Sequence, residues 1–174
     1  ADRDGDDHTE ESMNATQTLR HEHEVILEAL RVLGAMADRI DRGEKVPSTA
    51  VAEVLDFFRT FADKCHHAKE EDSLFPAMVR AGVPDRQGPI GVMLHEHDLG
   101  RGFLKELAEA LPGHDRGEPA AKKGVVDAAR SYRQLLEQHI MKENNILFMM
   151  ADQVLGPDDD RRVSEEFERH EQAK

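Results

Sequence analysis

Apolar residues recur at alternating steps of three and four through nearly the whole interior of this 174-residue chain. Two such series are Leu19, His23, Ile26, Leu30, Leu33, Ala37 and Ile40, and Ile90, Met93, His97, Gly100, Leu104, Leu107 and Leu111. This spacing is typical of one face of an α-helix, and the sequence shows no strand-like alternation between turn signals. The pattern therefore predicts an all-α fold.

Glycine and proline divide the chain into four long helical pieces. They are predicted to end at Gly43, Gly82, Gly113 and Gly156, and the last three to start near Pro47, Pro89 and Pro119. Four apolar stripes that face one axis predict an up-down four-helix bundle over residues 15–155. Residues 1–14 are predicted to be an acidic flexible tail, and residues 156–174 a short charged helix capped by Asp158.

Two parts of the sequence repeat within the chain. The string His66-x-x-Lys69-Glu70-x-x-x-Leu74-Phe75 returns as His139-x-x-Lys142-Glu143-x-x-x-Leu147-Phe148. Likewise, His21-Glu22-His23-Glu24 returns as His95-Glu96-His97-Asp98 at nearly the same separation. We infer two similar helix hairpins around a pseudo-twofold axis, which would bring equivalent polar positions to one level of the bundle. The repeat therefore predicts a paired site.

Several polar residues of the repeat fall inside the apolar stripes. Burying imidazoles and carboxylates costs several kcal/mol unless each group is paired or bound to a metal. A hydrogen-bonded His–Glu pair is the alternative explanation for a single inward histidine. Here the set comprises His23, His66, His97, His139, Glu70 and Glu143. A set of this size favours a metal site.

The angular positions of these residues suggest how two metals would be shared. At about 100° per residue, Glu70 lies about 40° and His67 about 100° from His66 around the helix. Glu70 is therefore predicted to bridge two metals, with His66 on one and His67 on the other. Glu143 is the expected second bridge, and His23 and His97 each supply a nitrogen. The predicted ligands are His23, His66, His67, Glu70, His97, His139 and Glu143.

The other candidate side chains receive simpler interpretations. His21 and His95 lie about 200° from the stripe histidines and are excluded as ligands, and His8, His114 and His170 are predicted to face solvent. For Tyr132, one heptad before His139, core packing and a hydroxyl near the metals both stay open. Arg101 is assigned to an exposed salt bridge in preference to stabilising an anionic ligand.

The composition restricts which metal and which classes of partner the protein is expected to bind. Five imidazoles and two carboxylates favour a first-row transition metal over magnesium or calcium, and iron is the predicted choice. The single cysteine, Cys65, supports neither an internal disulfide nor a thiolate zinc cage. A net charge of -13 disfavours nucleic acid and anionic membrane as partners. With no apolar run of about 20 residues and no leader-like start, a cytoplasmic location is expected.

Four motifs in order resemble the hemerythrin-like, HHE cation-binding family over about residues 15–155. They are Glu22-His23, Cys65 to Glu71 with Leu74-Phe75-Pro76, Glu96-His97-Asp98 with Arg101, and His139 to Glu143 with Leu147-Phe148. The resemblance implies a four-helix bundle with two non-haem irons, bridged by carboxylates and an oxo or hydroxo group. Such a centre reacts with dioxygen, peroxide or nitric oxide. Non-catalytic binding, storage or sensing of oxygen or iron is the alternative, and a protein partner stays unassigned.

The sequence also departs from the oxygen-carrying hemerythrins, whose third helix supplies two histidines four residues apart. Here Leu99 and Arg101 follow His95 and His97 at that interval. His67 is the expected substitute as fifth imidazole, and Glu44 is a less favoured ligand. The string Gly88 to Met93 is similar to the branch that repairs iron centres.

Overall fold

The computed structural model describes residues 13–173, and within this range every regular element is helical. The all-α prediction is confirmed. The predicted tail, residues 1–14, lies outside the described residues except for Met13 and Asn14. None of the described helices is both long enough and apolar enough to cross a membrane.

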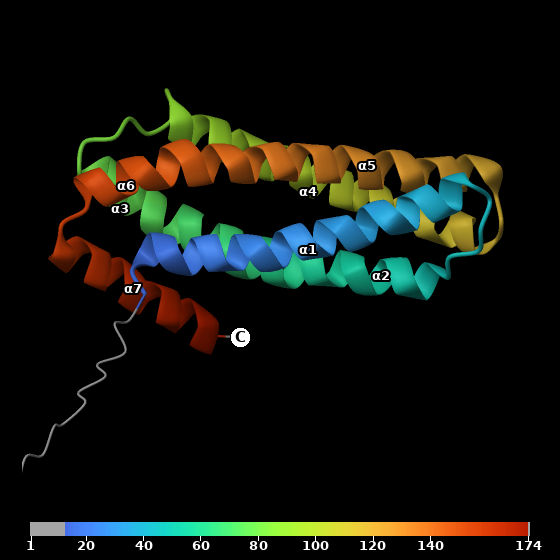
Figure 1. Ribbon diagram of the computed structural model, residues 1–174, viewed down its shortest axis with the longest axis horizontal. Helices are drawn as coiled ribbons and strands as arrows, with labels where there is room; N and C mark the ends of the chain where they lie inside the picture. Colours follow the sequence, from blue (N-terminus) through green and yellow to red (C-terminus); the bar gives the residue numbers. More distant parts are fainter. Residues whose placement is uncertain (1–12, 174) are drawn as a thin grey trace, which may run out of the picture.

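Four continuous helical rods run side by side along the long axis of the molecule (Figure 1). The first rod is α1 (Ala15–Asp41) and the third is α4 (Pro89–Asp115). The second joins α2 (Ser48–Phe57), η1 (Phe58–His67), η2 (Glu70–Leu74) and α3 (Phe75–Arg80), and the fourth joins α5 (Pro119–Lys142), η3 (Glu143–Leu147) and α6 (Phe148–Val154). The η segments are π-helical. A separate helix, α7 (Pro157–Gln172), follows the fourth rod.

The rods pack in a ring, because α1 contacts α5, α5 contacts α4, α4 contacts α2, and α2 contacts α1. Their inward faces form two apolar clusters. One contains Ile26 to Ile40 of α1 with Phe58, Leu107 and Leu136, and the other contains Leu19 with Leu74, Ile90 and Phe148. Between these clusters each rod contributes polar side chains to the core. Together they form one layer across the bundle, which we call the polar level.

Local sequence explains where the rods begin and end. Asn14 and Gln17 form a reciprocal capping box at the start of α1, with two hydrogen bonds of 2.9 Å. Prolines occupy the first position of α4, α5 and α7, where a missing N–H costs nothing. Gly43, Gly82 and Gly117 follow the first three rods with positive φ angles, as expected of helix-terminating glycine.

The third helix continues beyond Gly113, its predicted end. Pro112 is exposed in the last turn, and α4 extends to Asp115. Gly113 permits this turn to lie close to α5, because a Cβ there would stand 2.5 Å from Cβ of Ala121. His114 is consequently helical and only 4% exposed, and its Nε2–H donates to the Val46 carbonyl at 2.9 Å. The expected solvent-facing loop position for His114 is therefore wrong.

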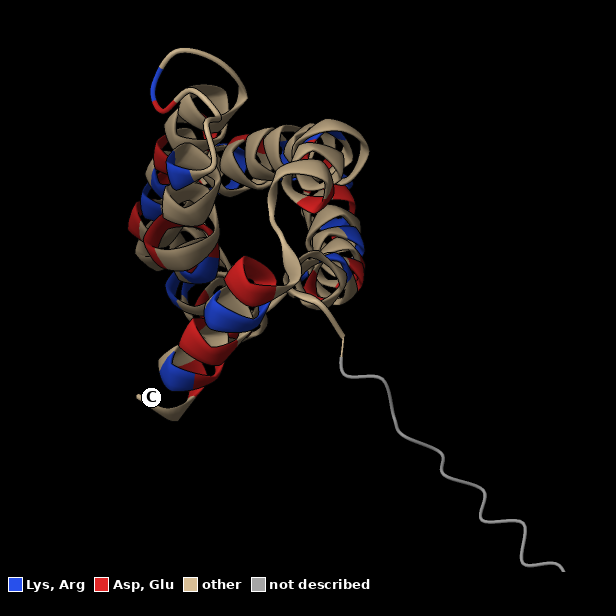
Figure 2. Ribbon diagram, turned by 90° about the vertical axis from the view of Figure 1, so that its left-hand side faces the viewer, with Lys and Arg blue, Asp and Glu red and all other residues tan. Residues whose placement is uncertain are grey.

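Helix α7 (Pro157–Gln172) lies within the predicted residues 156–174, and it packs against the bundle. Gly156 is its N-cap, and Asp158 lies in its first turn rather than at the cap, where a carboxylate favours the helix dipole. Figure 2 shows α7 as a heavily charged helix set against the bundle. Its inner face buries Val163 and Phe167 in the cluster with Leu74.

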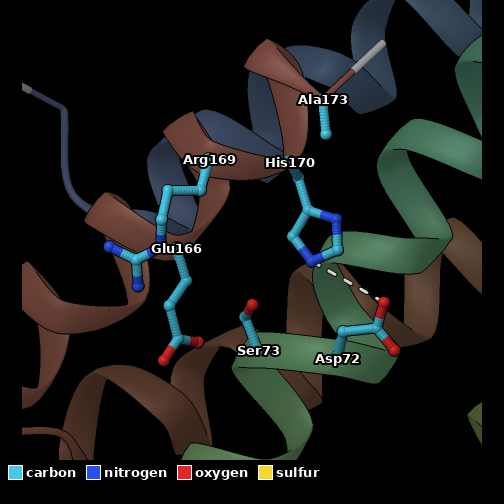
Figure 3. A pocket seen from close by; sticks show the side chains of 6 residues that line it. All are labelled: Asp72, Ser73, Glu166, Arg169, His170 and Ala173. Carbon is cyan, nitrogen blue, oxygen red and sulfur yellow. Dashed lines mark ion pairs between the residues drawn. The ribbon is translucent and has the colours of Figure 1, made fainter.

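A small pocket lies where α7 meets the second rod. Figure 3 shows the residues that line it: Asp72 and Ser73 on one side, and Glu166, Arg169 and His170 of α7 with the C-cap residue Ala173 on the other. His170 Nε2 lies 3.6 Å from Asp72 Oδ2, and its side chain is half-buried. His170 is thus only partly exposed to solvent, in contrast to the sequence expectation, because α7 folds back onto η2.

Candidate metal centre

All seven residues that the sequence predicts as metal ligands lie together in the polar level. They come from every rod: His23 on α1, His66 and His67 on η1, Glu70 on η2, His97 on α4, His139 on α5, and Glu143 on η3. Each is at most 4% exposed. Their ligand atoms form two groups: His67, Glu70, His97 and His139, and His23, His66, Glu70 and Glu143. Within each group these atoms lie within 4.8 Å of one another, and Glu70 belongs to both.

The two carboxylates each reach histidines on both sides of the level. Glu70 Oε1 lies 3.0 Å from Nε2 of His66 and 3.9 Å from Nε2 of His97. Glu143 Oε1 lies 3.2 Å from Nε2 of His23 and 3.0 Å from Nε2 of His139. Both carboxylates therefore stand where a bridge between two cations would stand.

The hydrogen-bonding state of these atoms tests whether the residues fit metal. Nε2 of His23 and His66 and all four oxygens of Glu70 and Glu143 are buried without a correctly oriented hydrogen-bond partner, despite the short separations. Buried polar atoms are rarely left in this state. Nε2 of His97 and of His139 face each other at 3.2 Å, close to the ~3.0 Å between nitrogens held ~2.1 Å from one metal at right angles. The donor set fits a pair of cations.

Outward-facing nitrogens of two histidines are held by equivalent carboxylates. His66 Nδ1 lies 3.1 Å from Glu22 Oε1, and His139 Nδ1 lies 3.1 Å from Glu96 Oε1. Lys69 donates to Glu22 at 2.8 Å, as Lys142 does to Glu96 at 2.6 Å. A carboxylate at Nδ1 fixes the ring orientation and leaves Nε2 as the metal-facing atom. The sequence repeat thus extends to this outer layer.

The remaining three histidines have different outer partners. His23 Nδ1 lies 2.8 Å from Asn144 Oδ1, and His67 Nδ1 lies 3.3 Å from Asp63 Oδ1. His97 Nδ1 lies 3.5 Å from Glu71 Oε2 without hydrogen-bond geometry. Sequence reasoning had not assigned these outer partners, because it considered only side chains that point toward the axis.

Burial and mutual charge set the protonation of the cluster. Burial, with the neighbouring charge of His66, lowers the pKa of His23 to about 4, and burial with His97 lowers that of His67 to about 3. Burial opposes charging of His66 too, but the Glu70 carboxylate overcomes it and raises the pKa of His66 to about 9. Burial alone would raise the pKa of Glu70, yet His66 holds it far below its ordinary value. His23 and His67 therefore keep free nitrogen lone pairs at neutral pH.

Other candidates lie apart from this level. His21 and His95 are exposed, as expected. Glu44 is exposed beyond the opposite end of α1, where it pairs with Arg42 at 3.0 Å. The Tyr132 ring packs edge-on against Phe58, 4.9 Å between centroids, in the apolar cluster. The Tyr132 ring thus packs in the core, as one of the two open interpretations predicts.

The π-helical turns are a feature that the sequence did not predict. Two of them, η2 and η3, begin at the carboxylates Glu70 and Glu143, since Phe75 N–H donates to the Glu70 carbonyl and Phe148 N–H to the Glu143 carbonyl. Such turns occur preferentially at functional sites. Steps of 100° per residue describe a regular α-helix and do not reveal them.

This geometry places the chain in a class of helical proteins with a histidine- and carboxylate-lined centre, and sequence comparison identifies that class. A sequence model of the hemerythrin HHE cation-binding domain matches residues 14–151, and the chain belongs to this family. Family membership implies cation binding, and the two residue groups are able to provide it.

Two relatives illustrate the range of the similarity. An iron–sulfur cluster repair protein YtfE of Salmonella newport is 32% identical over 133 residues, which cover 74% of this chain and 56% of the relative. An uncharacterized protein of Mycobacterium tuberculosis is 23% identical over 159 residues, 91% of this chain and 62% of the relative. The chain therefore spans less than two thirds of either relative.

Proposed function

We propose that the protein holds two iron ions at the polar level and that this pair reacts with dioxygen, peroxide or nitric oxide. The observation that carries the proposal is the pair of four-residue groups sharing Glu70, with buried atoms that lack a correctly oriented hydrogen-bond partner. The ring of four rods supports an up-down bundle of the hemerythrin type.

In this proposal the two metals have unequal protein shells. His67, His97 and His139 serve one metal, His23 and His66 serve the other, and Glu70 and Glu143 bridge them. The inequality follows from the repeat, because the position equivalent to His67 is Ile140, a buried apolar residue. Fewer protein ligands, His23 and His66 with the two carboxylates, would therefore hold the second metal, and a small ligand would bind on that side.

Bound iron would supply electron transfer and affinity for the small molecule. The chain supplies orientation and exclusion of water. Glu22 and Glu96 accept hydrogen bonds from Nδ1–H of His66 and His139 and fix both rings. Phe148 stacks on His23 at 5.3 Å and Phe75 lies 6.2 Å from His97. These rings give the level an apolar wall on the side of α3 and α6.

A non-catalytic role in sensing iron or oxygen is the second candidate, and one contact favours it. Lys69 Nζ lies 2.8 Å from Glu22 and 2.6 Å from Glu171 of α7. Since Glu22 holds His66, a chain of contacts runs from the proposed metal position to a helix at the surface. A change at the metal would then be read out through α7.

Anaerobic purification with metal analysis, followed by addition of dioxygen, hydrogen peroxide or nitric oxide, separates the two candidates. Two irons per chain and repeated consumption of the small molecule would support redox activity. A stoichiometric and reversible change in visible absorption without turnover would support sensing or carriage. Fewer than two metals, or retained zinc with no redox response, would contradict the diiron proposal.

Matched substitutions test the ligand assignment itself. Glu70→Ala and His139→Ala are expected to lose metal, because each removes a proposed ligand. His95→Ala should retain the metal, because His95 is exposed. It is a matched control, since it lies on the same helix as His97 and two residues before it. Equal metal loss from all three variants would contradict the assignment.

A further inference from the structure

The pseudo-twofold repeat is broken at one side of the polar level by three charged residues, Asp63, Glu71 and Arg101, which we call the ionic cassette. In the register that pairs His66 with His139, Asp63 corresponds to Leu136 and Glu71 to Asn144. In the register that pairs His23 with His97, Arg101 corresponds to Leu27. The other half of the molecule therefore carries no charge at any of these positions.

Arg101 joins the two carboxylates of the cassette. Its Nε donates to Asp63 Oδ1 at 2.9 Å and to Oδ2 at 3.1 Å, and its Nη2 donates to Glu71 Oε2. Its Nη1 also donates to Asp98 Oδ1 at 2.9 Å. Arg101 is half-buried. Besides the exposed salt bridge to Asp98, of the kind that the sequence predicts, it forms two part-buried ion pairs, with Asp63 and Glu71. A planar guanidinium holds two carboxylates in fixed directions in a way that lysine does not.

Both carboxylates of the cassette face histidines of the same metal position. Asp63 accepts from Nδ1 of His67 at 3.3 Å, and Glu71 Oε2 lies 3.5 Å from Nδ1 of His97. Asp63, His67 and Glu71 follow one another at steps of four on the second rod. In the other half, Nδ1 of His23 meets only the neutral amide of Asn144.

We propose that the ionic cassette makes the His67–His97–His139 position the tighter of the two metal positions and the first to fill, with Arg101 as the positioning residue. The inference rests on the two-metal function proposed above. Its physical basis is that an anionic acceptor at Nδ1 orients an imidazole and increases its basicity toward a metal. The cassette supplies one such acceptor, Asp63, and a second carboxylate, Glu71, 3.5 Å from Nδ1 of His97, to one position and neither to the other.

A positioning role and a purely electrostatic role for Arg101 predict opposite effects of its removal on metal affinity. If only net charge mattered, removing a cation beside the site would tighten metal binding. If Arg101 acts by holding Asp63 and Glu71 against the imidazoles, its removal frees both carboxylates, each already about one quarter exposed, to turn toward water. Metal binding at this position would then weaken.

The test is an anaerobic titration of the metal-free protein with ferrous iron enriched in ⁵⁷Fe, read by competition with a coloured chelator and by Mössbauer spectroscopy. The unaltered protein should bind its first iron at least tenfold more tightly than its second. One equivalent should give one quadrupole doublet, and a second doublet should appear only with further iron.

The informative variants replace a cassette residue with the residue type found at the equivalent position in the other half of the molecule. Arg101→Leu and Glu71→Asn should each weaken binding of the first iron by about ten- to one-hundredfold, leave the second within about threefold, and produce both doublets at one equivalent. Arg101→Lys should give an intermediate loss. Arg130→Leu is the matched control, since Arg130 also joins two carboxylates, Asp38 and Asp41, but near the far end of α1.

The outcomes separate this inference from the function on which it rests. Binding of fewer than two irons by the unaltered protein would overturn the two-metal function. Two irons that bind without separable steps, tighter binding in Arg101→Leu, or equal weakening of both steps would overturn the cassette proposal alone. Circular dichroism of each metal-free variant checks that the helices are retained.

Discussion

The five clustered histidines use their two ring nitrogens differently, one toward the axis and one toward an outer partner. The inward nitrogens were accessible to sequence reasoning, because His23, His97 and His139 lie in apolar stripes. The outer partners were not, because Glu22 and Glu96 sit one position before a stripe histidine and resemble surface residues. Contacts with His66 and Lys69 hold Glu22, and contacts with His139 and Lys142 hold Glu96, each from a neighbouring rod.

The outer glutamates give the first prediction. Glu22→Ala or Glu96→Ala should weaken metal binding by about ten- to one-hundredfold, because His66 or His139 loses the acceptor that orients its ring. Glu24→Ala is the control, since Glu24 is an exposed glutamate on the same helix. Competition with a chelator measures all three. An unchanged affinity in the Glu22 and Glu96 variants would show that the rings are oriented by packing instead.

Two glycines of α4 give a prediction about stability. A Cβ at Gly91 would stand 2.1 Å from the Arg86 carbonyl oxygen, whereas at Gly102 no atom lies within 4 Å. Gly91→Ala should destabilise the protein by about 1–3 kcal/mol through this backbone clash. Gly102→Ala should stabilise it by about 0.5–1 kcal/mol, because alanine favours the helix. Urea unfolding of both variants checks the opposite signs, and a common sign would contradict the packing at Gly91.

At the level of elements, sequence signals predicted the ends of the rods better than they predicted the helix geometry within each rod. Prolines and glycines marked most ends, since their backbone constraints act locally. The π turns after Glu70 and Glu143 and the extra turn beyond Pro112 depend on neighbouring rods instead. His114 was misplaced for the same reason, because its burial follows from contact with Val46 in another connection.

Helix α7 adds a further difference between the two halves of the bundle. It lies beyond the residues that match the family, and it buries Lys69 completely while its counterpart Lys142 stays 41% exposed. Lys69 also lies 5.7 Å above the ring of Phe167. The helix therefore shields one outer ion pair from water and leaves the other at the surface.

This packing predicts that α7 contributes to stability. Phe167→Ala should destabilise the protein by about 3–5 kcal/mol, because it removes a buried ring from the cluster with Leu74 and Phe75. Glu168→Ala, at an exposed neighbouring position, should change stability by less than about 0.5 kcal/mol. The free energy of unfolding in urea measures both. Equal effects would mean that α7 does not stay docked in solution.

Across the whole molecule, the polar level divides the core into two apolar clusters and is lined by residues from all four rods. In the metal-free protein, the buried oxygens of Glu70 and Glu143 have no adequate partners, and such groups destabilise a folded core. Metal bound there would satisfy these atoms and link the rods. The unfolded chain scatters the ligands, so binding energy at this level adds to folding stability.

The last prediction follows from that coupling. Saturation with ferrous iron under anaerobic conditions should raise the free energy of unfolding by about 4 kcal/mol for each site filled at a thousand times its dissociation constant. The urea midpoint should rise while the slope stays nearly constant, because the surface exposed on unfolding is unchanged. In Glu70→Ala the added metal should give little stabilisation, since that residue is shared by both groups. If iron stabilised both proteins equally, the metal would be bound somewhere other than the polar level.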